Sequence, residues 1–140
     1  MREILFRAKR LDNGEWVEGA YCPKRCSGDY PSIIKLGQPH EGRWFTIDPA
    51  TVGQFTGLCD KNGKKIFEGD IVRAKEADEI IGYCEIKFGE YAGHIGFYAD
   101  WYAGRMAKYF RNDLGYWATH KTIEVIGNRA DNKKLLEADE

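Results

Sequence analysis

Several features that would narrow the function are scarce in this sequence. Among 140 residues there are four prolines, three histidines and two methionines, and 21 basic residues nearly balance 22 acidic ones. The resulting formal charge of -1 gives no global attraction to nucleic acid, which usually requires a basic protein. No apolar run approaches the roughly 18 residues that a membrane helix needs, and Met1–Ile4 does not begin a secretory signal. We therefore expect a cytoplasmic protein without a membrane segment.

The parts of common catalytic sites are also missing. His40, His94 and His120 have no partner at metal-ligand spacing, and no Cys or Ser lies in a nucleophile motif. No glycine-rich loop precedes a predicted helix, so a phosphate loop is not indicated. We predict that the protein is not an enzyme and holds no cofactor.

The four cysteines leave two interpretations open. Cys22 and Cys26 are spaced as half of a zinc site, which Cys59 and Cys84 would have to complete. However, Cys59 and Cys84 are single, with 24 residues between them, whereas strong zinc patterns contain two close pairs. Cys84 also shares the phase of Ile86, where a small buried hydrophobic residue belongs. The pattern favours structural or incidental thiols over a zinc site.

The abundant residue types favour a mainly β fold. Sixteen glycines and an aromatic content of 14% suit short antiparallel strands and hairpins joined by tight turns. Residues 2–9 alternate, Asp12-Asn13-Gly14 favours a turn, and residues 15–21 return as the second arm of a hairpin, with Trp16 as its largest contribution to the core. The length fits one domain, 1–140, with a possible subdivision into an N-terminal hairpin region, 1–50, and the remainder, 51–140.

The second half predicts a compact β structure. Residues 80–88 and 94–101 alternate, and in the second of these strands we expect Ile95, Phe97, Ala99 and Trp101 to point inward. The strand rhythm from residue 69 to residue 101 is typical of a small, strongly bent barrel of SH3 type. Leu135 and Leu136 could dock one face of a short terminal helix. The sequence from residue 22 to residue 43 is predicted to be mostly loops.

The stretch 53–74, GQFTGLCDKNGKKIFEGDIVRA, is the most distinctive in the chain. It resembles the signature of the YopX family, small proteins found mainly in phages and prophages. The resemblance implies a mostly β fold and a phage-encoded protein in the cytoplasm of the host cell, but it brings no activity and no catalytic residues. The resemblance extends to the opening strand (4–8), the segment before the motif (48–54), the closing strand (123–128) and the terminal helix (135–136).

The acidic residues of this motif permit a functional and a structural interpretation. Asp60, Glu68 and Asp70 could bind a metal or act as acid and base. Asp60 also opens a turn, and Glu68-Gly69-Asp70 is a bend, where such side chains accept hydrogen bonds from backbone N–H groups. We predict that the motif residues are structural: Thr56, Gly57, Asp60, Gly63, Glu68, Gly69 and Asp70.

One segment mixes aromatic and basic residues in the way that single-stranded nucleic acid binding requires. The alternative is that its aromatics belong to the core and its cations to a solvated rim. The candidate nucleic-acid-binding residues are Tyr98, Trp101, Arg105, Lys108, Tyr109 and Arg111.

Two functional hypotheses follow. The first is a non-enzymatic accessory protein that binds another phage or host protein or assembles with itself, since unprotected strand edges invite pairing with another copy. The alternative is a protein that binds single-stranded or duplex nucleic acid through residues 98–111.

Overall fold

The computed structural model describes residues 3–23, 30–35, 44–91, 93–103, 114 and 123–136. The prediction of a mainly β fold is confirmed, because these residues form two antiparallel sheets and contain no helix of seven or more residues. The chain divides into two compact units, unit 1 (Met1–Phe55) and unit 2 (Thr56–Glu140), which we describe separately. The boundary lies within strand β5 (Gly53–Cys59), so this strand contributes to both units. The organisation as a single domain stays a prediction.

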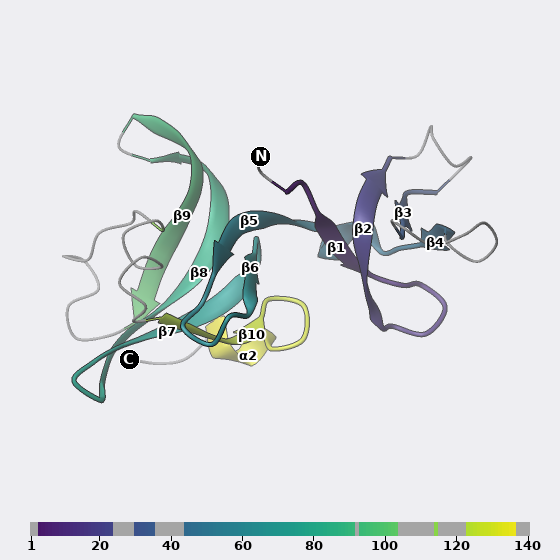
Figure 1. The fold of residues 1–140 in the computed structure, drawn as a ribbon. Coiled ribbons are helices and arrows are strands. Elements are labelled where there is room, and N and C mark those ends of the chain that lie inside the picture. The colour runs from purple at the N-terminus through teal and green to yellow at the C-terminus, as the bar shows by residue number, and fades with distance from the viewer. Residues whose placement is uncertain are drawn as a thin grey trace. The chain divides into compact units, whose positions relative to one another are not determined.

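Unit 1 is built from short antiparallel strands and one turn of 3-10 helix (Figure 1). Hydrogen-bonded neighbours follow the order β4-β3-β2-β1-β5. The elements are β1 (Phe6–Lys9), β2 (Trp16–Cys22), β3 (Ser32–Ile34), β4 (Trp44–Thr46) and η1 (Pro49–Thr51).

The predicted N-terminal hairpin is confirmed. β1 pairs with β2 in antiparallel register, from Phe6 opposite Gly19 to Lys9 opposite Trp16. Its turn uses Gly14 at a φ of 74°, a left-handed conformation that glycine adopts without steric cost. The Asn13 side chain accepts a hydrogen bond from the N–H of Glu15 at 2.9 Å, as expected for an Asn in a turn.

The sheet of unit 1 curls back on itself. Arg10 and Ile47 form an isolated antiparallel bridge, and the N–H of Asp48 donates to the carbonyl of Lys9 at 2.9 Å. These contacts tie the end of β4 to the end of β1. The curled sheet encloses a small apolar core whose buried members are Ala8, Val17, Ile33 and Ile47.

The prediction that Trp16 is the largest core side chain of the hairpin is wrong. Val17 is buried in the core, and successive residues of a strand point to opposite faces, so Trp16 lies on the other face. There its half-buried ring is covered by Arg7 and Lys9, whose charged groups lie 4.7 and 5.6 Å from the ring centroid. Attraction between the cations and the ring holds this arrangement.

Unit 2 contains a four-stranded antiparallel sheet of order β10-β7-β8-β9. Its core combines residues of all four strands with Ile66 from β6 and Leu114. One helical turn of four residues, α2, follows β10, and the predicted terminal helix is not confirmed beyond this turn. The remaining elements are β6 (Lys65–Phe67), β7 (Asp70–Glu76), β8 (Glu79–Tyr91), β9 (His94–Ala103), β10 (Ile123–Asn128) and α2 (Lys133–Leu136).

The described strands do not form the predicted SH3-like barrel. Within the part of the chain that the structure describes, no pairing joins the edge strands β9 and β10, so the sheet stays open. The β8–β9 hairpin is long, with strands of 13 and 10 residues. Within β8, only Glu79–Glu85 pair with β7. The rest of the β8–β9 hairpin extends past β7 as a curved two-stranded ribbon (Figure 1).

The same extension overturns part of the predicted strand orientation. Ala99 is buried, and Phe97 and Trp101 pack against the core, as expected. Ile95 is 78% exposed, however, because it lies on the part of the hairpin that extends past the core. Alternation predicts which face a side chain occupies, but not whether another element covers that face.

Candidate functional site

The carboxylate of Asp60 organises the turn between β5 and β6. It is buried, and one oxygen accepts hydrogen bonds from the N–H groups of Asn62 and Lys64 at 2.8 and 2.9 Å. The second oxygen accepts from the N–H of Val125 in β10 at 2.9 Å. A single side chain thus satisfies a turn and fixes it to a strand more than sixty residues away. This arrangement favours the structural interpretation of Asp60.

The bend at Gly69 and Asp70 is held in the same way. Gly69 has a φ of 93°, its N–H donates to the carbonyl of Ile86, and its own carbonyl accepts from the N–H of Arg129, both at 2.8 Å. Asp70 is 1% exposed, and its carboxylate accepts a hydrogen bond from the N–H of Phe67 at 2.7 Å. The motif residues therefore connect strands of unit 2.

Thr56, Gly57 and Gly63 have local backbone roles. The Thr56 hydroxyl donates to the carbonyl of Ile66 at 2.8 Å, which ties β5 to β6. Gly57 and Gly63 have φ angles of 91° and 81°, which side chains disfavour. Glu68 lies half-buried at the bend. Within the described residues no group of three or more His, Cys, Asp or Glu side chains could hold a metal ion.

The described residues do not bring the predicted nucleic-acid site together. Trp101 packs against the core of unit 2, while Tyr98 lies on the opposite face of β9. Near Tyr98 the cation Lys87 is paired with Asp100 at 2.7 Å, which reduces its attraction for phosphate. Burial raises the pKa of the neighbouring Tyr102 to about 12. The other four candidates lie outside the described residues: Arg105, Lys108, Tyr109 and Arg111.

The cysteines that the structure describes differ in environment. Cys22 is buried in unit 1 and Cys84 in unit 2, whereas Cys59 is exposed on β5. Burial, with smaller contributions from Asp100 and Glu85, raises the pKa of the Cys84 thiol well above its ordinary value. Cys26 lies outside the described residues.

These environments predict selective thiol chemistry. Because the thiolate is the reactive form, Cys59 should react with iodoacetamide in the native protein, whereas Cys22 and Cys84 should react only after denaturation. Mass spectrometry of the digested protein assigns the label to each cysteine. Labelling of native Cys84 at the rate of Cys59 would contradict the buried placement.

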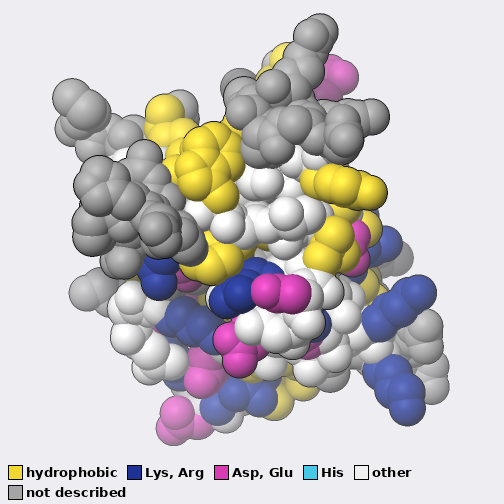
Figure 2. All heavy atoms as spheres, turned by 90° about the vertical axis from the view of Figure 1, so that its right-hand side faces the viewer, with side chains coloured by type: hydrophobic (Ala, Val, Ile, Leu, Met, Phe, Trp, Pro, Cys, Tyr) yellow, Lys and Arg dark blue, Asp and Glu magenta, His cyan; other side chains and the backbone are white. Residues whose placement is uncertain are grey.

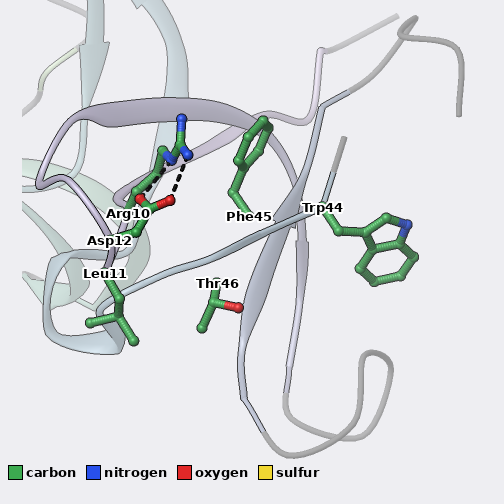
Figure 3. A pocket seen from close by; sticks show the side chains of 6 residues that line it. All are labelled: Arg10, Leu11, Asp12, Trp44, Phe45 and Thr46. Atoms are coloured by element: carbon green, nitrogen blue, oxygen red, sulfur yellow. Dashed lines mark hydrogen bonds and ion pairs between the residues drawn. The ribbon is translucent and has the colours of Figure 1, made fainter. Parts of the chain in front are cut away.

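An open groove of about 440 Å³ lies on the described part of unit 1. It lies where the end of β1 and the following turn meet β4 (Figure 3). Two backbone contacts position its walls, the Arg10–Ile47 bridge and the hydrogen bond from the N–H of Leu11 to the carbonyl of Thr46 at 3.0 Å. The residues that line it are Arg10, Leu11, Asp12, Trp44, Phe45 and Thr46.

One of the residues that line this groove is a paired cation, Arg10. The Arg10 guanidinium makes two hydrogen bonds to the Asp12 carboxylate, at 2.7 and 3.0 Å, and its carbon atom lies 4.5 Å from the Phe45 ring centroid. The hydrogen bond from Arg10 holds the pKa of Asp12 below its ordinary value. The paired charges and the ring contact orient the Arg10 side chain over Phe45.

The apolar rim of the groove is exposed. Trp44 is 45% and Leu11 is 56% exposed, and Figure 3 shows the Trp44 indole pointing away from the Arg10–Phe45 stack. In the view of Figure 2, hydrophobic side chains lie above and beside touching basic and acidic side chains. Trp and Arg are among the residue types enriched at the hot spots of protein interfaces.

The sequence interpretation missed this groove. Trp44 and Phe45 are adjacent on a strand, so they must point to opposite faces. Phe45 packs against the core of unit 1, which leaves Trp44 exposed. The pair of consecutive aromatic residues on a short strand is the signal in the sequence that could have indicated this groove. The contribution of Arg10 and Asp12 depends on the bridge to Ile47, which no local pattern predicts.

Comparison with known proteins identifies the family. The YopX protein family model matches residues 5–137, so the chain belongs to the YopX family, as the resemblance of its central motif predicts. Protein EF1440 from Enterococcus faecalis has a similar crystal structure, with 26% sequence identity and a TM-score of 0.52 over 97% of this chain and 99% of that one. No curated protein matches the sequence.

The described residues contain no candidate for a membrane-spanning helix. None of their helices has the length and apolar character that crossing a membrane would require.

Proposed function

We propose that this YopX-family chain is a non-enzymatic binding protein that takes an extended segment of another protein into the groove of unit 1. In this proposal it is a phage or prophage accessory factor that acts in the host cytoplasm. The observation that carries the proposal is the exposed Trp44 on the same strand as Phe45, the ring over which Arg10 is paired with Asp12.

The groove chemistry favours an apolar peptide over an anion. Asp12 already neutralises Arg10 through two hydrogen bonds, so a phosphate would have to displace a bidentate partner. Trp44 and Leu11 offer apolar surface whose burial is favourable by roughly 25 cal/mol per Å². The open shape suits an extended segment better than a small substrate, which enclosed pockets bury.

The nucleic-acid alternative depends on residues 98–111. In its support, Tyr98 is a partly exposed aromatic side chain and the segment that follows is basic. Against it, Trp101 contributes to the core and Lys87 is paired with Asp100. Arg105→Glu together with Lys108→Glu separates the hypotheses, since a nucleic-acid site there would lose affinity for a mixed-sequence oligonucleotide, whereas peptide binding in unit 1 would be unchanged.

Peptide display tests the proposal because it lets the groove select its own ligand. The purified chain is used to select binders from a random peptide library, and the affinity of a selected peptide is measured by calorimetry. Trp44→Ala should weaken binding at least about tenfold, because truncating a Trp anchor typically removes about 2 kcal/mol or more.

The matched control is Tyr30→Ala. Tyr30 is also an exposed aromatic of unit 1, but it does not line the groove. Its replacement should change the affinity less than twofold, roughly the size of a rim effect. Failure to select any peptide, or equal binding by the Trp44→Ala variant, would reject the groove as the binding site.

A further inference from the structure

A group of basic side chains gathers on the outer face of the unit 2 sheet, the face opposite to its core. Arg73 of β7 lies opposite Glu124 of β10 and donates a hydrogen bond to the Glu124 carboxylate at 2.9 Å. The ammonium of Lys61, in the turn between β5 and β6, lies 3.9 Å from the same carboxylate. Lys75 shares the face of Arg73, because Ala74 between them is buried in the core. The fold thus brings together cations from two separate segments.

The carboxylate that these cations surround does not balance their charge. The hydrogen bond from Arg73, together with the charges of the three cations, holds the pKa of Glu124 below its ordinary value. Glu85, on the same face of β8, is already held by two hydrogen bonds from Arg129 at 3.0 Å. Three positive charges against one negative leave this cluster with an excess of two, in a protein whose formal charge is -1.

Arg73 differs from Arg10 of the unit 1 groove in the way it is paired. Asp12 accepts two hydrogen bonds from two nitrogens of Arg10, whereas Glu124 accepts one from Arg73. The Nε–H of Arg73 is buried and makes no hydrogen bond to the residues that the structure describes. Glu124 therefore uses only part of the donor capacity of this guanidinium, and a second anion can share it without displacing a bidentate partner.

An aromatic side chain lies directly beside the cations. Tyr83 of β8 is opposite Arg73 in the register, so the two side chains lie on the same face of the sheet. The next residue of β8, Cys84, is buried in the core, and Tyr83 is half-buried on the other face. Cations that contact phosphates, beside a ring on which a base stacks, are the combination that single-stranded nucleic acid requires.

From these observations we infer that the outer face of unit 2 binds single-stranded nucleic acid. Lys61, Arg73 and Lys75 contact phosphates, and a base stacks on Tyr83. Alternate residues of a strand are roughly 6.6–6.8 Å apart, a spacing along β7 that suits neighbouring phosphates of an extended strand. This site is separate from the groove of unit 1, which the proposed function uses, and from the alternative site at residues 98–111.

Fluorescence anisotropy of the full chain with a labelled thymidine oligonucleotide of about 12 nucleotides tests this inference. Three phosphate contacts predict a slope of about -2 for log K against log salt concentration, since each contact on a single strand contributes roughly -0.7. Lys61→Gln with Lys75→Gln should weaken binding at least about tenfold and reduce the slope to about -0.7. The matched control, Lys133→Gln with Lys134→Gln, removes two exposed lysines of α2 and should change the affinity less than about twofold.

Two further variants distinguish binding from a structural effect. Glu124→Gln removes the competing carboxylate and should strengthen binding about two- to fivefold, the size of an exposed charge interaction. Tyr83→Leu removes the ring but keeps an apolar side chain, and it should weaken binding about fivefold or more, because base stacking contributes at least that much. An abasic oligonucleotide of the same length should bind the unmodified chain with a similarly reduced affinity.

The inference is overturned by absence of binding at low salt, by equal weakening in the α2 control, or by equal affinity for the abasic strand. Loss of binding in Arg105→Glu with Lys108→Glu, but not in the Lys61 and Lys75 variant, would favour the alternative site instead. Tighter binding to vesicles of phosphatidylserine and phosphatidylcholine would indicate a membrane surface. Trp44→Ala should leave the oligonucleotide affinity unchanged, so this test and that of the unit 1 groove fail independently.

Discussion

Replacing Asp60 with alanine is expected to lower the free energy of unfolding by about 3–4 kcal/mol. The substitution removes an acceptor that three backbone N–H groups share, at 2.8 to 2.9 Å. The N–H groups of Asn62 and Lys64 belong to exposed residues and can turn to water, but that of Val125 lies in a buried residue. Leaving a buried donor without its acceptor costs more than the hydrogen bond itself contributes.

Two variants make this expectation specific. Asp48→Ala removes a turn aspartate that accepts one backbone hydrogen bond, from Ala50 at 3.0 Å, and should cost about 1 kcal/mol. Asp60→Asn keeps one acceptor oxygen but places an amide donor in the structure, so its cost should fall between the two. Urea denaturation measures all three, and a loss for Asp60→Ala no larger than that for Asp48→Ala would show that the motif carboxylate is not a structural hub.

Gly19→Ala is expected to disrupt unit 1 and to cost at least about 3 kcal/mol. A Cβ atom at this position would lie 2.1 Å from the carbonyl oxygen of Ile34 and 3.1 Å from a methyl carbon of Ile33. The first contact is with backbone, which cannot move aside as a flexible side chain can. Strand β3 would have to shift, and Ile33, a fully buried core residue, would shift with it.

Gly89→Ala is the matched control for this prediction. Its Cβ atom would meet only the Tyr98 ring at 3.7 Å, an ordinary contact, so stability should change by less than about 1 kcal/mol. Hydrogen exchange of the Ile33 and Ile34 amides should rise sharply in Gly19→Ala and stay unchanged in Gly89→Ala. Unchanged exchange in both variants would contradict the close approach of β2 and β3.

Local structure could be predicted from the sequence better than the burial of side chains by strands that lie far away in the chain. Asn13-Gly14 and Asp60 identify their turns because the side chain and backbone preferences act within a few residues. Alternation identifies the strands, and the central motif identifies the family. The exposure of Ile95 was predicted wrongly because it depends on where β7 begins opposite β8, which alternation in β9 does not encode.

The candidate site was the least predictable part. The groove requires Arg10 and Asp12 to meet Phe45, and this contact depends on backbone pairing of Arg10 and Leu11 with residues 46 and 47. Residues 98–111 were prominent in the sequence because aromatics and cations alternate there. Trp101, however, contributes to the core, as aromatic residues in strands commonly do.

The most direct test of the proposed function is an NMR titration of the isotope-labelled chain with a peptide selected on it. Peptide binding in the groove predicts chemical-shift changes concentrated at residues 10–12 and 44–46, with small changes elsewhere. Changes concentrated instead in β8 and β9, or spread without a centre, would contradict the assignment of the groove of unit 1 as the binding site.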